Sequence, residues 1–487
     1  MDFNSITFLL LFPIVSIVYY LIPFGMQRYW LLLIDVLFYL FADCTYLPLL
    51  TGIIVISYLG AIIIEKRRSA SKIILATCIV LNLGILICFK YASFFCKSIL
   101  SIIPFNEPSV PNFMSQLVMP LGVSFFTFQV IGYLIDVYRS RISAERNLID
   151  YSIFVSFFPK LISGPIVKAE SFLPQIKGEK CFDTELVKEG LITLAYGVFL
   201  KMVVADNIAY AIESAFSGID TYSGMNLFVS MLLYSIQIYC DFNGYSQMAI
   251  GVSKILGYRL CENFQTPYLA QSVTEFWRRW HISLTSWFRE YLYIPLGGNR
   301  KGKVRKDVNI MIVFLLSGLW HGASWHFVIW GGINGILLIV EDVLFPQVQK
   351  LFCWIGIDKN RLGYKAIRVT LTYIVISVTW LFFRFGCHDA IFIIKKIIFN
   401  FSVEWILNCR FVNMFGESRN LAIILISLVV LLLFGICQKK SISIRRILFE
   451  QQLLVRWTAY LVILGVIICC GAYGEGYEQT EFIYFQF

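Results

Sequence analysis

The chain has 487 residues, of which 58% are hydrophobic and only 15% are charged, and its mean hydropathy is +0.73. A composition this apolar excludes a soluble domain and indicates a protein that spans a membrane several times. Basic loops on the cytosolic side of such a protein explain the net charge of +10, and no segment resembles a nucleic-acid-binding module. We therefore expect the lipid bilayer, and no nucleic acid, as a partner.

The apolar runs are unbroken and about 20 residues long, which predicts transmembrane helices rather than the short alternating strands of a membrane barrel. We predict an all-α polytopic membrane protein. No repeat or linker divides the chain, so we treat residues 1–487 as a single membrane-embedded domain. The expected spans are 5–24, 29–43, 48–64, 72–90, 116–138, 186–205, 225–240, 307–322, 325–343, 366–386, 419–437 and 456–473.

Clusters of Lys and Arg predict which loops face the cytosol. The clusters lie at residues 66–68, 139–146, 160–180, 300–306 and 439–446. All of them can face the cytosol together if the N-terminus lies outside. This topology places both ends of the chain on the extracytoplasmic side.

A short apolar segment broken by Pro159 and Pro165 interrupts the pattern of simple spans. Irregular backbone survives at membrane depth only where protein or a water-filled cavity surrounds it. We therefore expect residues 148–168 to form a re-entrant or interfacial element beside a cavity.

Residues 273–326 form a polar stretch within this apolar chain and hold three of its four histidines. A helix over 273–292 would place Trp277 and other aromatic residues on one face, Arg278 on another and His281 at the border. Such an amphipathic helix lies at an interface or dips into a cavity. The spacing leaves two interpretations open: His281 takes part in chemistry, or it is incidental in an interfacial anchor.

The sequence SGLWHGASWH places His321 among small residues that allow two backbones to approach closely. A histidine has a pKa of about 6.5, which suits proton transfer at neutral pH. The alternative is a core histidine satisfied by a backbone carbonyl, a role that also fits His326. No cluster of carboxylates or cysteines lies nearby in the sequence, so we predict no metal site.

Two further polar features are the loop 294–306, within the polar stretch, and Asp241, which precedes it. The loop 294–306 combines glycines with five basic residues and could hold the phosphates of a donor, although a basic cytosolic loop explains it as well. Asp241 lies where a span is expected, and a charge in lipid is costly. We expect Asp241 to face a cavity or to pair with Arg278 or Arg279, and we favour a structural ion pair.

The tail over residues 474–487 combines three glutamates with four aromatic side chains in its last six residues. So many aromatic groups are too apolar for a free tail in solvent, so we expect them to pack. Two interpretations stay open: the tail helps to dock a partner or seals an exit beside it, or it anchors the chain at the membrane interface.

Several long motifs occur in order along the chain: PLGVSFFTFQ (120–129), FFPKLISGPI (157–166), YCDFNGYSQMAIG (239–251), FWRRWHISLTSWFREYLYIPLGGNR (276–300), SGLWHGASWHFVIWG (317–331) and FIYFQF (482–487). With these motifs the sequence resembles the membrane-bound O-acyltransferase family, in particular the branch that contains bacterial alginate O-acetyltransferase. The resemblance implies a ring of roughly 10–12 tilted transmembrane helices, with re-entrant or interfacial helices, around a central funnel or tunnel. The core motifs lie within residues 119–331.

The resemblance also implies a catalytic histidine in SGLWHG, which is His321, and a second polar position in FWRRWH, which is His281. We expect the substrate contacts to come from the same motifs: Trp277, Arg278, Arg279, Asp241, Asn243, Trp320 and Arg300. No bound cofactor is implied, and acetyl-CoA or another acyl thioester is the donor.

In the plasma (inner) membrane of a bacterium, such a protein moves an acyl group, here acetyl, from a cytosolic thioester towards an extracytoplasmic polysaccharide. An extracytoplasmic acyltransferase is the expected partner. A similar branch transfers D-alanine from a carrier protein to teichoic acid, which is the alternative. A transporter or flippase usually carries broken helices in two repeats, whereas the polar residues here lie in one region.

Overall fold

The computed structural model describes residues 3–100, 118–355, 358–401, 418–473 and 482, and within these ranges it contains helices and no β-strand. Each of the twelve expected spans contains a helix. These helices are α1 (Ile6–Leu21), α2 (Phe24–Asp43), α3 (Leu47–Lys66), α4 (Ser71–Leu86), α7 (Val123–Tyr138), α11 (Thr184–Val198), α13 (Gly224–Ile255), α16 (Lys303–His321), α17 (Trp325–Trp354), α18 (Leu362–Arg384), α22 (Ser418–Lys439) and α24 (Leu453–Cys470). The prediction of an all-α polytopic protein is confirmed, although α13 runs well beyond the expected end at residue 240.

Shorter helices connect these spans. They are α5 (Ala92–Leu100), α8 (Leu148–Ser156), α9 (Phe158–Leu161), α10 (Ala169–Lys177), α12 (Asp206–Ser217), α14 (Val273–Arg279), α15 (Ile282–Phe288), α19 (Cys387–Phe399) and α23 (Ile444–Phe449). A π-helical segment, Phe199–Ala205, links α11 to α12.

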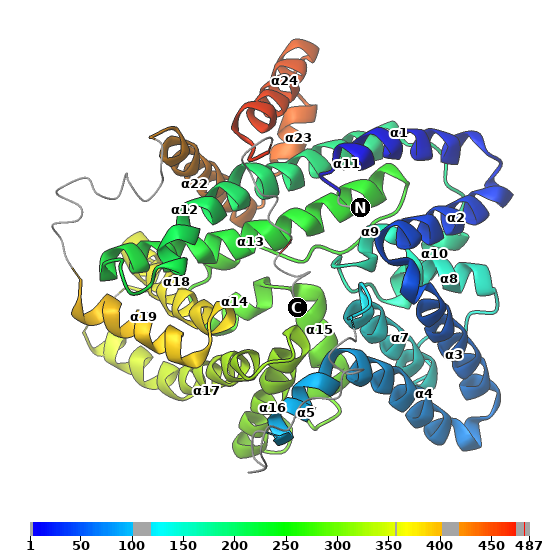
Figure 1. Cartoon of the computed structure of the whole chain (residues 1–487), viewed down its shortest axis with the longest axis horizontal. Coiled ribbons are helices and arrows are strands. Elements are labelled where there is room, and N and C mark those ends of the chain that lie inside the picture. Colours follow the sequence, from blue (N-terminus) through cyan, green and yellow to red (C-terminus); the bar gives the residue numbers. More distant parts are fainter. Residues whose placement is uncertain (1–2, 101–117, 356–357, 402–417, 474–481, 483–487) are drawn as a thin grey trace. The chain divides into compact units, whose positions relative to one another are not determined.

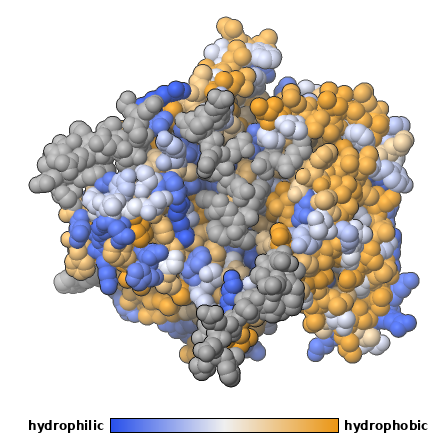
Figure 2. Space-filling view, in the orientation of Figure 1, coloured by the Kyte–Doolittle hydropathy of each residue, from blue (hydrophilic) through white to orange (hydrophobic). Residues whose placement is uncertain are grey.

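Eight helical stretches among the described residues are long and apolar enough to cross a membrane. Their outer surfaces are apolar too: Leu432, Leu433, Leu454 and Leu461 of α22 and α24 are all exposed. Hydrophobic residues cover much of the visible surface over α1 to α4 (Figure 2). Water does not stabilise apolar surface of this extent, whereas lipid does, so the chain is a multi-pass membrane protein.

The described chain divides into two compact units. The first comprises residues 1–194 and 249–261, and the second comprises residues 195–248 and 262–487. The elements of both are labelled in Figure 1. The single domain expected from the sequence and the ring of helices implied by the resemblance stay predictions.

In the first unit, residues 148–168 form two short helices broken at Phe157, and the segment is buried almost throughout. Lys160 is 3% exposed, and its Nζ donates to Gln129 Oε1 at 2.7 Å and to the carbonyl oxygen of Phe154 at 2.6 Å. Burial lowers the pKa of Lys160 to about 7. The irregular backbone expected here is therefore surrounded by protein, while its depth in the membrane stays a prediction.

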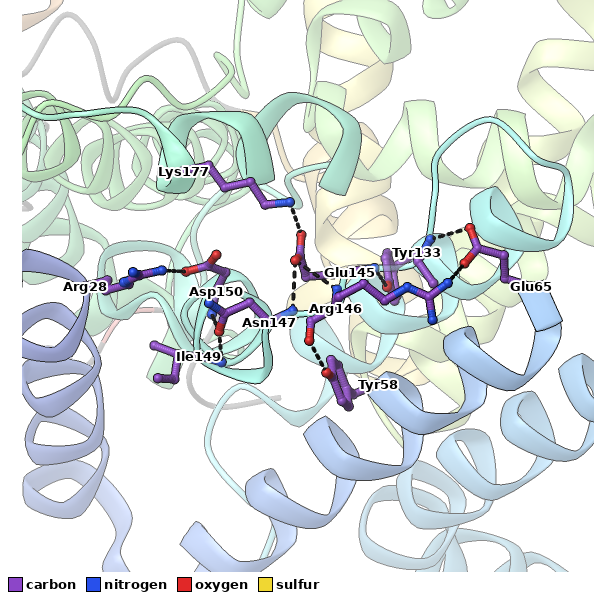
Figure 3. A network of polar contacts seen from close by, with 11 residues as sticks. Arg28, Tyr58, Glu65, Tyr133, Glu145, Arg146, Asn147, Ile149, Asp150 and Lys177 are labelled. Carbon is purple, nitrogen blue, oxygen red and sulfur yellow. Dashed lines mark hydrogen bonds and ion pairs between the residues drawn. The ribbon is translucent and has the colours of Figure 1, made fainter. Parts of the chain in front are cut away.

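Helix ends and a loop of the first unit that we expect on the cytosolic side contact one another (Figure 3). Glu65, near the end of α3, pairs with Arg146 and accepts the backbone N–H of Ala144. Glu145 lies 2.7 Å from Lys177 at the end of α10. Three separate segments thus meet through ion pairs, which agrees with their predicted place on one side of the membrane.

In the second unit, α16 and α17 form a helical hairpin (Figure 1). The two backbones touch at Gly318 and Gly331: a Cβ on Gly318 would lie 2.2 Å from the carbonyl oxygen of Phe327, and one on Gly331 would lie 2.2 Å from that of Phe314. No larger side chain fits without moving a helix. The small residues around His321 therefore do allow close backbone approach, as expected.

Candidate active site

The helix expected over residues 273–292 is broken, which corrects the prediction from sequence. α14 ends at Arg279, α15 begins at Ile282, and His281 between them has a φ of +43°. This left-handed conformation is uncommon for a residue with a side chain and typically costs about 1–3 kcal/mol. The amphipathic pattern could not show the break, because aromatic residues continue on both sides of it.

The N-terminus of α14 is fixed to α17. Ser272 caps the helix, since its Oγ accepts the backbone N–H of Glu275 at 3.0 Å. The carboxylate of Glu341 accepts the backbone N–H groups of Val273 and Thr274 at 3.0 and 2.8 Å. A carboxylate at a helix N-terminus is electrostatically favourable, so these contacts hold the polar stretch against the helical hairpin.

His321 is the last residue of α16 and is 4% exposed. Its ring contacts Trp330 with centroids 5.2 Å apart, Phe383 at 5.4 Å and Trp320 at 5.0 Å. The imidazole therefore lies in an aromatic environment formed by α16, α17 and α18.

His281 is 2% exposed and lies in the same unit. Its ring contacts Phe242 of α13 with centroids 4.7 Å apart and Trp320 at 6.0 Å. Burial lowers the pKa of His281 to about 3, so its imidazole is neutral at neutral pH. The two histidines of the two motifs thus contact one indole, that of Trp320.

Asn263, which the sequence analysis did not single out, binds His281 from outside the motifs. Asn263 Oδ1 lies 3.3 Å from His281 Nδ1 and 2.7 Å from the hydroxyl oxygen of Ser283. On its other side the amide Nδ2 donates to Ser246 Oγ at 3.2 Å. Asn263 therefore connects His281 to α13.

Asp241 does not pair with Arg278 or Arg279, which corrects that expectation. Its Oδ1 lies 2.8 Å from Lys201 Nζ, and Lys201 lies 2.9 Å from Asp206 as well. Asp241 and Lys201 are 3% and 2% exposed. The structural ion pair that we favoured is present with a different partner, because the π-helical segment before α12 places Lys201 beside α13.

Asn243 is buried one turn beyond Tyr239 on α13. Its Nδ2 donates to the hydroxyl of Tyr239 at 3.2 Å, and its Oδ1 accepts from Gln247 Nε2 at 3.4 Å. Gln247 also donates to Glu262 at 2.8 Å. These bonds form a buried polar row along α13, so Asn243 is part of a network and not an isolated polar group.

Trp277 lies next to a neighbour of His321, whereas the three arginines expected to contact substrate are more peripheral. The indole of Trp277 contacts Trp330, with centroids 5.6 Å apart, and thereby touches an aromatic neighbour of His321. Arg279 is half-buried and pairs with Glu275 on its own helix. Arg278 and Arg300 are exposed.

His326 has the structural role considered for it. Its Nδ1 lies 3.3 Å from the carbonyl oxygen of Phe382, and its ring packs on Phe327. A backbone carbonyl of α18 thus satisfies this side chain.

Phe482 is the one residue of the C-terminal tail within the described ranges; the rest of the expected docking segment lies outside them. Its side chain is 3% exposed. The ring contacts Tyr245 with centroids 5.3 Å apart, and Lys201 Nζ lies 4.5 Å from its centroid. The prediction that tail aromatics pack is confirmed at Phe482, which lies against the buried ion cluster of Lys201, Asp206 and Asp241.

The second unit can therefore offer two histidines in a water-poor aromatic environment beside a buried polar row. An imidazole in such a place can take a proton from a hydroxyl, and a second one can hold a reacting group. Sequence reasoning missed the residues that complete this environment: Lys201, Asn263, Trp330 and Phe383. A lysine within an apolar run was the available signal for Lys201, since such a charge requires a partner.

Comparison with known proteins indicates the family of the chain. Residues 137–383 match the model of MBOAT, the membrane-bound O-acyltransferase family. The chain is 35% identical over 444 residues to the probable alginate O-acetylase AlgI of Azotobacter vinelandii, which covers 90% of this chain and 85% of that protein. It is 36% identical over 386 residues to the peptidoglycan O-acetyltransferase of Helicobacter pylori, over 73% of this chain and 71% of that protein.

A more distant relative is the teichoic acid D-alanyltransferase of Bacillus subtilis, which is 27% identical over 320 residues, or 60% of this chain and 76% of that protein. The matched range contains both buried histidines and the polar row of α13. The chain belongs to the membrane-bound O-acyltransferase family, and it is an O-acyltransferase.

Proposed function

We propose that the chain moves an acetyl group from acetyl-CoA on the cytosolic side of a bacterial inner membrane towards an extracytoplasmic polysaccharide. The contact of both His281 and His321 with Trp320 carries this proposal, because it brings two proton-handling groups into one buried place. The relatives that are O-acetylases or O-acetyltransferases favour acetyl as the group transferred.

In the proposed reaction His321 acts as general base. It takes the proton of an acceptor hydroxyl as the hydroxyl oxygen attacks the thioester carbonyl carbon. The carbon–sulfur bond then breaks, the electron pair stays on sulfur, and the proton on His321 is returned to the thiolate. A histidine base typically contributes about 10²–10⁴-fold in rate.

We place the donor on the side of the basic segment 300–306; the loop expected over 294–306 ends at Gly302, so residues 303–306 form the first turn of α16. Arg300, Lys301 and Lys303 are exposed, whereas Lys306 pairs with Asp342 at 2.8 Å. Exposed cations attract the phosphates of CoA. The acceptor side then carries an extracytoplasmic acyltransferase partner, and both termini of the chain lie on that side.

Transfer of D-alanine from a carrier protein is the second candidate, favoured by the D-alanyltransferase relative. The two candidates differ in the donor and share the histidines. Acidic carrier proteins and CoA are both negatively charged, so both can bind the basic segment. An assay with each donor therefore decides which of the two the protein uses.

The test uses the full-length chain in inverted membrane vesicles supplied with acetyl-CoA or with D-alanyl carrier protein. We expect release of free CoA thiol that depends on the chain, together with base-labile acetyl on extracytoplasmic polysaccharide in cells. Consumption of the D-alanyl carrier without CoA release would overturn acetyl transfer in favour of the alternative. Passage of an intact solute without any donor would overturn acyl transfer itself.

A further inference from the structure

The amide of Asn263 has a defined orientation. The backbone N–H of Ser283 points at it from 3.3 Å, and a backbone N–H can only donate. The atom facing Ser283 must therefore be the oxygen Oδ1. The opposite choice would set an NH₂ group against an N–H group and would also remove the acceptor of the Ser283 hydroxyl.

The orientation of Asn263 determines which nitrogen of His281 carries the hydrogen. His281 Nδ1 lies 3.3 Å from the same Oδ1, and an amide oxygen accepts hydrogen bonds but never donates them. Nδ1 must therefore be protonated. Because burial keeps this imidazole neutral, it has one N–H group, and Nε2 then holds a lone pair.

Backbone hydrogen bonds hold the segment of Asn263 against the segment of His281. Ile282 donates its backbone N–H to the carbonyl oxygen of Asn263 at 2.9 Å, and Gln265 donates its own to that of Arg279 at 3.0 Å. The segment holding Asn263 is thus bonded to the chain on both sides of His281. The left-handed conformation of His281 lies within this frame, so the helix break and the side-chain contact belong to one local structure.

We infer that Asn263 is a positioning residue that holds His281 in the Nδ1–H tautomer, so that His281 serves acyl transfer as a hydrogen-bond acceptor through Nε2. This inference rests on the proposed function. It removes one of the roles open to a second histidine, because a neutral imidazole whose N–H is bound to Asn263 has no donor with which to polarise the thioester carbonyl. The remaining role is to accept a hydrogen bond from a substrate hydroxyl or N–H group.

The direct test is nitrogen NMR of the full-length chain, labelled with ¹⁵N-histidine and held in lipid nanodiscs. The chain has four histidines, and the spectrum of His281→Asn identifies the pair of signals that belongs to His281. We expect a protonated, pyrrole-type Nδ1 and an unprotonated, pyridine-type Nε2. A protonated Nε2 on neutral His281 would overturn the inference, whatever the activity.

Two variants of Asn263 separate positioning from simple folding. Asn263→Asp keeps an oxygen acceptor, so we expect the same tautomer, an upward shift of the pKa of His281 and a smaller fall in kcat than in Asn263→Leu. Asn263→Leu removes the acceptor, so we expect loss of the Nδ1–H signal and a fall in kcat of about 10-fold or more, part of the contribution of a positioned base. Equal activity and an unchanged tautomer in Asn263→Leu would contradict the role of Asn263.

The outcomes also distinguish this inference from the proposed function. An unaltered chain that shows the Nδ1–H tautomer but releases no CoA from acetyl-CoA would overturn acetyl transfer and leave the tautomer intact. An active chain whose His281 carries its hydrogen on Nε2 would leave acyl transfer standing and overturn the inference.

Discussion

The Nζ of Lys201 lies 2.8 Å from Oδ1 of Asp241, and both side chains are buried within the second unit. Asp206 adds a second carboxylate 2.9 Å from the same ammonium. Removing the lysine would take an ammonium away from two carboxylates, that of Asp241, which is buried, and that of Asp206, which is largely buried. Loss of one partner of a buried pair typically costs about 3–5 kcal/mol, so we expect Lys201→Met to lower the Tm of the detergent-solubilised protein substantially.

The control for Lys201→Met is an ion pair in solvent. Arg446 pairs with Glu450 at 2.8 Å, and its side chain is 81% exposed. We expect Arg446→Ala to change the free energy of unfolding by about 0.5 kcal/mol or less.

Combining Asp241→Leu with Lys201→Met should recover part of the lost stability, because it removes one of the two carboxylates that face Lys201. A double variant that loses as much as both single variants added together would argue that the pair is not coupled.

The second histidine gives a graded prediction. His281→Ala should lose most acyl transfer, whereas His281→Asn should retain more, because an asparagine oxygen can still accept a hydrogen bond near the position of Nε2. The measurement is ester-linked acetyl on polysaccharide, normalised to the amount of protein in the membrane. Equal losses in the two variants would show that an imidazole, and not simply a hydrogen-bonding group, is required.

The basic loop gives a prediction about donor binding. Replacing Arg300, Lys301 and Lys303 with Ala should raise the apparent KM for acetyl-CoA more than it lowers kcat, because the cations attract donor phosphates before the reaction. Arg361→Ala is a suitable control, since Arg361 is 82% exposed on a different loop. A fall in kcat with an unchanged KM would contradict the donor-binding role.

The same loop also tests the topology. A cysteine placed at Lys303 should react with an impermeant thiol reagent only from the cytosolic side. Labelling only from outside would show that the orientation of the chain in the membrane is the opposite of the predicted one.

Phe482, in the C-terminal tail, is buried, so its contribution to stability can be tested separately from the rest of the tail. Phe482→Ala should lower the Tm, because replacing a buried Phe with Ala typically costs about 3–5 kcal/mol. Deletion of residues 483–487 keeps Phe482 in the chain. We expect the deletion to keep folding and donor hydrolysis intact and to lower polysaccharide acylation strongly.

Comparing these two variants separates anchoring from docking. Deletion of 482–487 removes both the buried ring and the terminal aromatics. If the chain without residues 483–487 acylates polysaccharide at the full rate, the tail has no part in the hand-off to a partner.

The sequence could predict the elements of the fold because each span carries its own hydrophobic signal. It could also single out His281 and His321, through motifs that resemble a known family, and the structure places both rings against Trp320. It could not predict the break at His281, since both sides of the break continue the same aromatic pattern. That break depends on backbone bonds to residues 263–265, which lie outside the helix.

The sequence also could not predict which residues from distant parts of the chain pair with one another. The charge of Asp241 required a partner, but the nearest arginines in the motifs were the wrong choice, and the π-helical turn that delivers Lys201 has no clear sequence signature. Asn263 was missed for the same reason. A single polar residue in a loop becomes informative only when the fold places it against a histidine.

The most direct test of the account is the His321→Ala variant of the full-length chain. Its ring is buried against Trp320, Trp330 and Phe383, and we assign it the proton transfer of the reaction. CoA release and polysaccharide acetylation should both fall by about 10²–10⁴-fold while the amount of folded protein in the membrane stays within twofold. Acetylation close to that of the unaltered chain, at equal protein level, would contradict the assignment of His321 as the base.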